Sequence, residues 1–329
     1  MARKLFTNAR VVTATEVFLG TVELHAGRIV RVDLGATNLP GAEDCAGDYL
    51  LPGLVDLCAG TRSHRADRRH RATVSRHALV SRDLQWAVNG VTTVCHTVPL
   101  EDASVFDGAV EAIRSGRRDG GLRVDHWLHL DATADPASPA ETAFRSSLIR
   151  CLSLDCRLPV RRVLESPCLA LAREQHCAIL GTGLRAMEGV RLAAQAGASV
   201  CRDPSTLLLA RAIREHGMLT ATAATDVLAG VSPGRAGRSA RLAQRGCIDV
   251  LTTGESPLSL LQLPFVLRDA FGWSLPTAVI AASGRPADLA GFHDRGRIAL
   301  GLRADLVRVR EASGTPIPVA TWRGGDRVA

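Results

Sequence analysis

Four side chains in this sequence could do acid–base or nucleophilic chemistry, and each stands at the end of a predicted strand. They are Cys58, His129, Asp131 and Glu255. A thiol, an imidazole and two carboxylates could form a catalytic site if these strand ends meet. The competing interpretation is that His129 is a core histidine with satisfied hydrogen bonds and that Cys58 is a small buried hydrophobic residue. Lone histidines and cysteines are more often structural than catalytic, so the sequence favours the second interpretation.

A second candidate site is the glycine-rich segment 230–238, Gly-Val-Ser-Pro-Gly-Arg-Ala-Gly-Arg. Its backbone N–H groups, its arginines and the N-terminus of the helix expected after it could hold a phosphate group. The candidate ligand-binding residues are Ser232, Arg235 and Arg238. The alternative is a solvated glycine-rich turn, and the sequence does not decide between the two. The segment therefore allows binding without turnover.

Strands that alternate with helices predict the framework that must position these residues. Strands are expected at about 50–57, 91–97, 124–130, 147–154, 177–181, 198–201, 218–223 and 248–253. Helices are expected at about 75–89, 104–117, 167–176, 184–196, 204–216, 236–246, 258–271 and 275–283. Such a pattern closes most economically as an α/β fold, a (β/α)₈ TIM-like barrel. A doubly wound open sheet is the alternative, weakened by the lack of a Gly-x-Gly-x-x-Gly turn.

Strands without intervening helices mark the start of the chain. Residues 3–12 and 20–33 have the pattern of short strands, with a hairpin turn at Ala26-Gly27. They predict a small β unit outside the barrel.

The apolar run Leu50 to Gly60 has the pattern of a buried parallel strand whose end opens a cleft. Within it, Pro-Gly-Leu-Val-Asp-Leu at 52–57 resembles the first barrel strand of the amidohydrolase superfamily. The segment 295–307 and the strand pattern at 320–328 resemble the closing signature of that superfamily. The resemblance implies that both chain ends form one small β-sandwich. The expected parts are residues 1–50 and 293–329 for the β-sandwich and 51–292 for the amidohydrolase-like barrel.

Several further segments resemble one amidohydrolase family of phosphonate breakdown, the PhnM-type alpha-D-ribose 1-methylphosphonate 5-triphosphate diphosphatases. They are 81–94, 123–130, 204–218, 246–261, 285–287 and 304–307. The resemblance covers most of the chain, although a family segment near 150–170 is shortened. It implies a metal-assisted attack of water on a triphosphate ester that releases pyrophosphate.

The metal-ligand motifs of this family are degenerate here. Its His-x-Asp falls on Cys58 and Gly60, and its Ser-His-Asp-Asp falls on 181–184, Gly-Thr-Gly-Leu. The loop histidine falls on Pro233, and the last Ser-Ser-Asp falls on 252–254, Thr-Thr-Gly. Such side chains do not form a divalent-metal site. Lys4 is the only lysine and lies outside the barrel, so it cannot bridge two metals. We therefore expect no metal and no other cofactor, although family members use a divalent metal.

Composition limits the remaining possibilities. The 329 residues carry a net charge of +7, almost wholly from arginine, which suits phosphate recognition through its planar fork. Nucleic-acid binding is the alternative, disfavoured because only 4% of residues are aromatic. The nine cysteines form no Cys-x-x-Cys pair, which indicates reduced thiols and a cytoplasmic protein. No signal peptide and no membrane-spanning run is visible.

Two function classes stay open. One is a hydrolase of the phosphonate family with an unusual or residual site. The other is a pseudoenzyme, a non-catalytic binding or partner subunit that forms a homo-oligomer or pairs with an active homologue. The residues favour the second class and the resemblance favours the first. A phosphorylated small molecule is the expected ligand in either case, with no membrane and no nucleic acid as partner.

Overall fold

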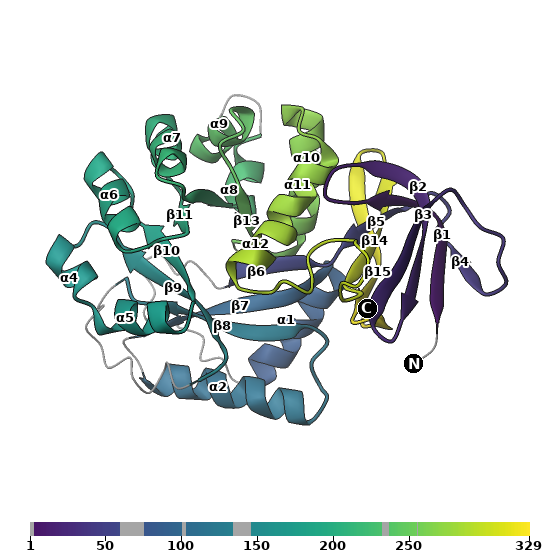
Figure 1. The fold of residues 1–329 in the computed structure, drawn as a ribbon, viewed down its shortest axis with the longest axis horizontal. Helices are drawn as coiled ribbons and strands as arrows, with labels where there is room; N and C mark the ends of the chain where they lie inside the picture. The colour runs from purple at the N-terminus through teal and green to yellow at the C-terminus, as the bar shows by residue number, and fades with distance from the viewer. Residues whose placement is uncertain (1–2, 60–75, 101–102, 134–145, 232–236, 255) are drawn as a thin grey trace.

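The computed structural model of the protein describes residues 3–59, 76–100, 103–133, 146–231, 237–254 and 256–329. These residues form a barrel and, beside it, a second sheet that contains both chain ends (Figure 1). Within these residues, no helix is both long and apolar enough to cross a membrane.

Eight parallel strands form the barrel in the order of the sequence. They are β6 (Leu54–Ala59), β7 (Val91–Pro99), β8 (Asp125–Asp131), β9 (Ile149–Asp155), β10 (Ala178–Thr182), β11 (Val200–Arg202), β12 (Leu219–Ala223) and β13 (Val250–Thr252). The first and last strands meet, because the carboxylate of Asp56 in β6 accepts a hydrogen bond of 2.5 Å from the hydroxyl of Thr253. The predicted TIM-like barrel is therefore confirmed.

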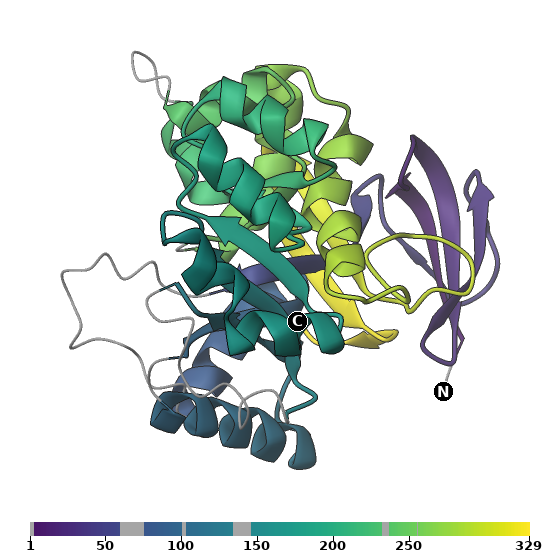
Figure 2. The same cartoon turned by 60° about the vertical axis from the view of Figure 1, so that its left-hand side comes forward.

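Helices lie on the outside of the barrel (Figures 1 and 2). They are α1 (Arg76–Val88), α2 (Ala103–Arg118), α4 (Val160–Leu164), α5 (Pro167–Glu174), α6 (Met187–Gln195), α7 (Leu207–Glu215), α8 (Ala224–Ala229), α9 (Arg238–Gln244), α10 (Pro257–Phe271), α11 (Leu275–Ala282) and α12 (Gly284–Leu289). The short helices α4, α8 and α12 were not predicted. The expected start of α7 at Pro204 was wrong, because Thr206 caps this helix by accepting a hydrogen bond of 3.2 Å from the N–H of Leu209.

The barrel interior is packed rather than hollow below its mouth. Inward residues from several strands form one buried cluster, which includes Val55, Cys95, Leu180 and Val250. Phe292 joins this cluster from the segment after α12. Small and branched side chains on alternate strand positions fill the interior in this way in TIM barrels.

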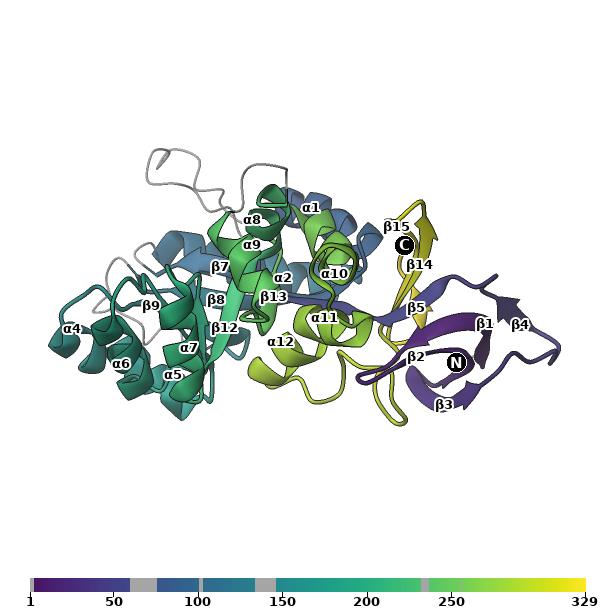
Figure 3. The same cartoon turned by 90° about the horizontal axis from the view of Figure 1, so that it is seen from above.

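The second sheet joins both chain ends and runs in the order β16-β15-β14-β5-β1-β2-β3, with β4 paired to β1. Its strands are β1 (Lys4–Val12), β2 (Val17–His25), β3 (Arg28–Leu34), β4 (Ala42–Asp44), β5 (Tyr49–Pro52), β14 (Leu306–Ala312), β15 (Thr315–Arg323) and β16 (Asp326–Arg327). Figure 3 shows the N-terminal and C-terminal strands together at one end of the molecule. The predicted hairpin turn is present, with Ala26 and Gly27 both at positive φ.

The apolar run at 50–60 is two strands rather than the single strand expected at 50–57. β5 belongs to the terminal sheet, where it pairs with β1 and β14, and β6 begins the barrel. Gly53 separates them at a point where a Cβ atom would overlap the side chain of Thr92. This glycine allows the chain to pass directly from one sheet to the other.

Candidate functional site

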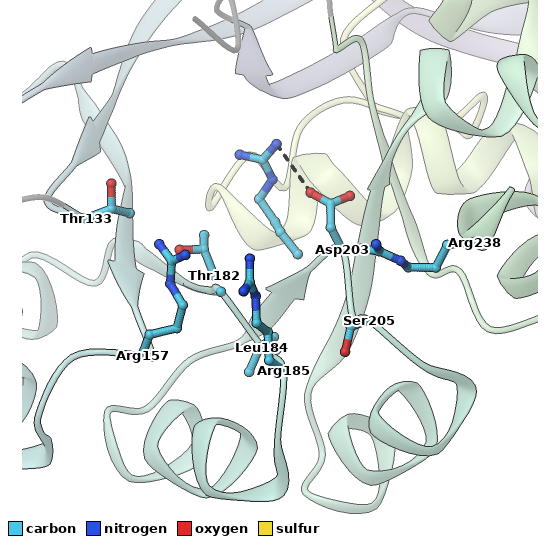
Figure 4. Close-up of a pocket in the computed structure, with 10 residues that line it drawn as sticks. Thr133, Arg157, Thr182, Leu184, Arg185, Asp203, Ser205 and Arg238 are labelled. Atoms are coloured by element: carbon cyan, nitrogen blue, oxygen red, sulfur yellow. Dashed lines mark ion pairs between the residues drawn. The ribbon is translucent and has the colours of Figure 1, made fainter. Parts of the chain in front are cut away.

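One cavity of about 680 Å³ lies at the carboxyl ends of the barrel strands (Figure 4). This is the face on which TIM barrels place their reacting groups. Its lining includes three hydroxyl side chains, Thr133, Thr182 and Ser205, and four arginines, Arg157, Arg185, Arg202 and Arg238. The cavity is therefore suited to an anion that accepts hydrogen bonds.

Arg157, which follows β9, forms the closest ion pair of the four arginines among the described residues. Its Nε lies 2.8 Å and 3.0 Å from the two carboxylate oxygens of Asp155. Gly183 leaves room for this ion pair, because a Cβ atom there would lie 2.5 Å from Oδ1 of Asp155. Gly183 lies in the segment 181–184, where the sequence resemblance implies a metal-ligand motif. The structure instead has a glycine there, next to an arginine–carboxylate pair.

Arg185 and Arg238 are exposed at the rim of the cavity and extend toward it from different sides (Figure 4). Arg185 follows β10, and Arg238 is the first residue of α9. The described part of the chain gives neither of them a carboxylate partner. Both guanidinium groups can therefore turn toward a ligand without breaking an ion pair.

Arg202, the last residue of β11, is the deepest of the four arginines. Its side chain is 16% exposed, compared with 43% for Arg157. Within the described residues, its ion-pair partner is Asp203, with a carboxylate oxygen at 3.9 Å, which is beyond hydrogen-bond distance. Its Nε is buried and has no hydrogen-bond partner among the described residues.

Negative charge around Arg202 comes from strands on other sides of the barrel. Cys58 would raise the pKa of Arg202 most if its thiol were ionised, burial lowers that pKa, and the carboxylates of Asp203, Asp131 and Asp56 raise it. An arginine side chain is charged at every pH at which a protein folds. The mouth of the barrel thus contains a fixed cation.

Cys58 and His129 are brought together, as the strand positions predicted, with Sγ 3.3 Å from Nδ1. However, Nδ1 of His129 lies 2.7 Å from the carbonyl oxygen of Leu57, so it carries the hydrogen and donates it there. Nε2 of His129 lies 2.7 Å from Oγ of Ser153 and accepts its hydrogen. Both ring nitrogens therefore have partners, and neither is free to accept the thiol proton of Cys58.

Burial makes the same pair chemically inert near neutral pH. It raises the pKa of the Cys58 thiol to about 12 and lowers the pKa of His129 to about 4. A thiolate nucleophile with a protonated histidine beside it would need the opposite shifts. The geometry thus favours a structural role for Cys58 and His129 over the catalytic role that their positions at strand ends suggested.

The other predicted site residues are placed differently. Asp131 ends β8 at the cavity side of the barrel, where its carboxylate accepts a hydrogen bond of 3.1 Å from the N–H of Thr133. Of the predicted ligand-binding residues, Arg238 lines the cavity. Ser232, Arg235 and Glu255 lie outside the described residues.

Two further buried histidines, His96 in β7 and His126 in β8, face helix α1. Nε2 of His96 lies 2.7 Å from Nδ1 of His126, and Nε2 of His126 lies 2.9 Å from a carboxylate oxygen of Asp83 in α1. Trp86 of the same helix packs edge-on against both rings. These two histidines therefore connect the sheet to α1 and do not reach the cavity.

The donor set of the described residues does not fit a divalent metal. Among these residues, no group of three or more His, Cys, Asp or Glu side chains converges on one point. At Gly254, where the sequence resemblance implies a catalytic carboxylate, φ is +71° and a Cβ atom would overlap Oγ1 of Thr225. Any side chain at this strand end would need a local rearrangement.

The buried histidines predict that the protein loses stability in mild acid. Burial lowers the pKa of His129 to about 4 and also lowers the pKa values of His96 and His126. The unfolded chain takes up these protons near pH 6.5, so the stabilisation is complete above that pH and is lost as pH falls toward 4. Urea denaturation should show a free energy of unfolding that falls over this window, by up to about 3 kcal/mol from His129 alone.

His129→Gln should reduce this pH dependence, whereas the same change at the exposed His293 should leave it as it is. A free energy of unfolding that stays constant from pH 6.5 to 4 in the unmodified protein would contradict the prediction.

Three arginines of the cavity, Arg157, Arg185 and Arg202, were not predicted as site residues. Each follows a predicted barrel strand, which was the available signal, but arginine supplies all but one of the 40 basic residues. A single arginine in such a chain has no distinguishing pattern.

Known proteins resemble this chain in sequence and in fold. No family model matches the chain. The alpha-D-ribose 1-methylphosphonate 5-triphosphate diphosphatase of Escherichia coli (strain K12) is 27% identical over 378 aligned residues, which cover 98% of this chain and 100% of the relative.

Solved structures agree on the fold. The N-acetylglucosamine-6-phosphate deacetylase from Pasteurella multocida superposes with a TM-score of 0.75 at 14% identity, covering 99% of both chains. A solved amidohydrolase superposes with a TM-score of 0.71 at 14% identity, covering 99% of this chain and 98% of the other. The chain therefore has the fold of the amidohydrolase superfamily and resembles the ribose methylphosphonate triphosphate diphosphatase over nearly its whole length.

Proposed function

We propose that this protein binds a phosphorylated small molecule in the arginine-lined cavity and does not hydrolyse it with a metal. The observation that carries the proposal is a set of four arginines at the mouth of the barrel, where the described residues hold no cluster of metal-ligating side chains. Four guanidinium groups line the cavity, whereas the described part of the chain brings two carboxylates, those of Asp155 and Asp203, within 4 Å of them. An excess of positive charge is left for a ligand.

The chemistry of the lining favours a phosphate ester over a carboxylate. A guanidinium group binds two phosphate oxygens at once through parallel N–H groups, and hydroxyl side chains donate to the third. Both kinds of donor are present, since Thr133, Thr182 and Ser205 line the same cavity. The diphosphatase that the chain resembles is named for a phosphorylated ribose derivative, which supports a sugar phosphate as the ligand class.

A cavity of about 680 Å³ is large enough for such a ligand, since sites for small molecules commonly measure about 300 to 1,000 Å³. Among the described residues, the candidate thiol and imidazole are not activated, because Cys58 is a buried thiol and both nitrogens of His129 are occupied. Binding is therefore the function that these side chains support best.

Isothermal titration with ribose 5-phosphate as the probe tests the proposal, with EDTA present throughout. Binding with a Kd at or below about 1 mM is expected for ribose 5-phosphate and none for ribose, because the phosphate supplies the contacts. The affinity should fall as salt is added, since the exposed arginines are screened.

Arginine variants separate local contacts from overall charge. The double variant Arg185→Gln and Arg238→Gln should weaken binding about threefold to tenfold, through two rim charges. The matched double variant Arg211→Gln and Arg245→Gln removes the same charge from exposed positions outside the cavity, one in α7 and one directly after α9, and should have little effect. If ribose 5-phosphate does not bind to the unmodified protein at millimolar concentration, the proposed function is wrong.

A further inference from the structure

A guanidinium group occupies the part of the barrel mouth that is otherwise surrounded by acidic and thiol side chains. Arg202 ends β11, a strand paired on one side with β10 and on the other with β12. Asp203 follows it directly, while Cys58 and Asp131 belong to β6 and β8 on another side of the barrel. Arg202 is thus a side chain of the barrel wall itself, unlike the rim residues Arg185 and Arg238.

The hydrogen-bonding capacity of Arg202 is largely unused. A guanidinium group has five N–H donors, and the described part of the chain offers Arg202 one carboxylate, at 3.9 Å. Its buried Nε has no acceptor at all among the described residues. Buried donors without acceptors are rare and costly, so each one calls for a ligand or a bound solvent molecule. Arg202 itself is one of the residues that line the cavity.

The loose pair with Asp203 fits a residue that exchanges partners. Asp203 has φ of +51°, a conformation uncommon outside glycine, and its carboxylate accepts a hydrogen bond of 3.3 Å from the hydroxyl of Thr222. This bond holds the carboxylate beside Arg202 without a close contact between them. An anion that enters the cavity can therefore take the donors of Arg202 while the Asp203 charge keeps the side chain oriented.

We propose that Arg202 is the cation that binds the phosphoryl group of the ligand, in place of the metal that related enzymes use; this rests on the proposed function. A guanidinium group needs no protein ligands and no particular protonation state, so it binds phosphate over the whole stable pH range. It cannot lower the pKa of a bound water molecule as a metal does. A guanidinium group in place of a metal ion would thus explain both why the phosphate ligand is bound and why it is not hydrolysed.

The test compares three variants in EDTA, with ribose 5-phosphate and inorganic phosphate as probes in isothermal titration. Arg202→Gln should weaken ribose 5-phosphate binding at least about thirtyfold, because it removes a charge-assisted double hydrogen bond from a buried position. Arg202→Lys should weaken the binding of ribose 5-phosphate less than Arg202→Gln does, because lysine keeps the positive charge but lacks the paired N–H groups of the guanidinium. Arg185→Gln, which changes an exposed residue at the rim, should weaken the binding of ribose 5-phosphate at most about threefold.

The outcomes distinguish this inference from the proposed function. If the unmodified protein binds the probe and Arg202→Gln binds it equally well, Arg202 is not the anchoring cation, although the cavity still binds phosphate. If no protein binds the probe, the proposed function itself fails. Circular dichroism and thermal melting establish that each variant is folded before it is titrated.

A measurement on the unmodified protein covers the case in which Arg202→Gln does not fold. Phenylglyoxal modifies accessible arginine side chains, and mass spectrometry locates the modified residues. Ribose 5-phosphate should slow the modification of Arg202 severalfold and leave that of Arg245, outside the cavity, unchanged. Equal protection of both residues, or of neither, would overturn the assignment of Arg202.

Discussion

Pyrophosphate release from alpha-D-ribose 1-methylphosphonate 5-triphosphate should stay at background when this protein is incubated with zinc, manganese, magnesium or iron ions. Hydrolysis of a phosphoanhydride needs an activated water molecule and neutralisation of the charge on the transferred phosphoryl group. The arginines of the cavity can provide the second but not the first. Because enzymes accelerate such reactions by about a million-fold or more, the expected loss of rate is very large.

The diphosphatase of Escherichia coli serves as the positive control in the same assay. Restoring two family residues with Cys58→His and Gly60→Asp should not rescue turnover, since Thr182 and Gly254 still leave the site short of ligands. Turnover by the unmodified protein at rates like those of the relative would show that a different set of residues carries the chemistry. Elemental analysis of the same preparation should find no stoichiometric metal, and a tightly held metal that is lost in Cys58→Ala would contradict that prediction.

The barrel could be predicted because its elements repeat a simple pattern along the chain. Each predicted strand overlaps one of β6 to β13, since apolar runs of four to eight residues bounded by turns suit strands buried on both faces. The boundary at Gly53 was missed because β5 and β6 are adjacent, mostly apolar segments that are buried along their whole length. Nothing in their composition separates a strand of the terminal sheet from one of the barrel.

The candidate site was only partly predictable, because spacing fixes which strand ends meet but not how side chains satisfy one another. Cys58 and His129 do approach each other, as their strands require. Their partners Leu57 and Ser153, which occupy both nitrogens of the ring, depend on register and rotamer and leave no mark in the sequence. The depth of Arg202 is likewise a property of the fold, as the terminal residue of a three-residue strand could have pointed elsewhere.

Restoring the family carboxylate at the end of β13, by Gly254→Asp, should destabilise the protein. Gly254 has φ of +71°, which costs a residue with a Cβ atom about 1 to 2 kcal/mol. The new Cβ would also overlap Oγ1 of Thr225 and lie 3.2 Å from Cβ of Ala223. Crowding of this kind costs about 1 to 3 kcal/mol. The free energy of unfolding should therefore fall by about 2 to 5 kcal/mol, measured by urea denaturation at pH 7.

Two alanine variants separate backbone strain from crowding in this effect. Gly272 also has φ of +71°, but no atom lies within 4 Å of the Cβ position there. Gly254→Ala should therefore destabilise more than Gly272→Ala, and the difference measures the contact with Thr225. Adding Thr225→Ala to Gly254→Asp should recover part of the loss, because it removes the overlapping hydroxyl. If Gly254→Asp is as stable as the unmodified protein, the strand end has room for a carboxylate, and the loss of the family ligand there is not fixed by the surrounding structure.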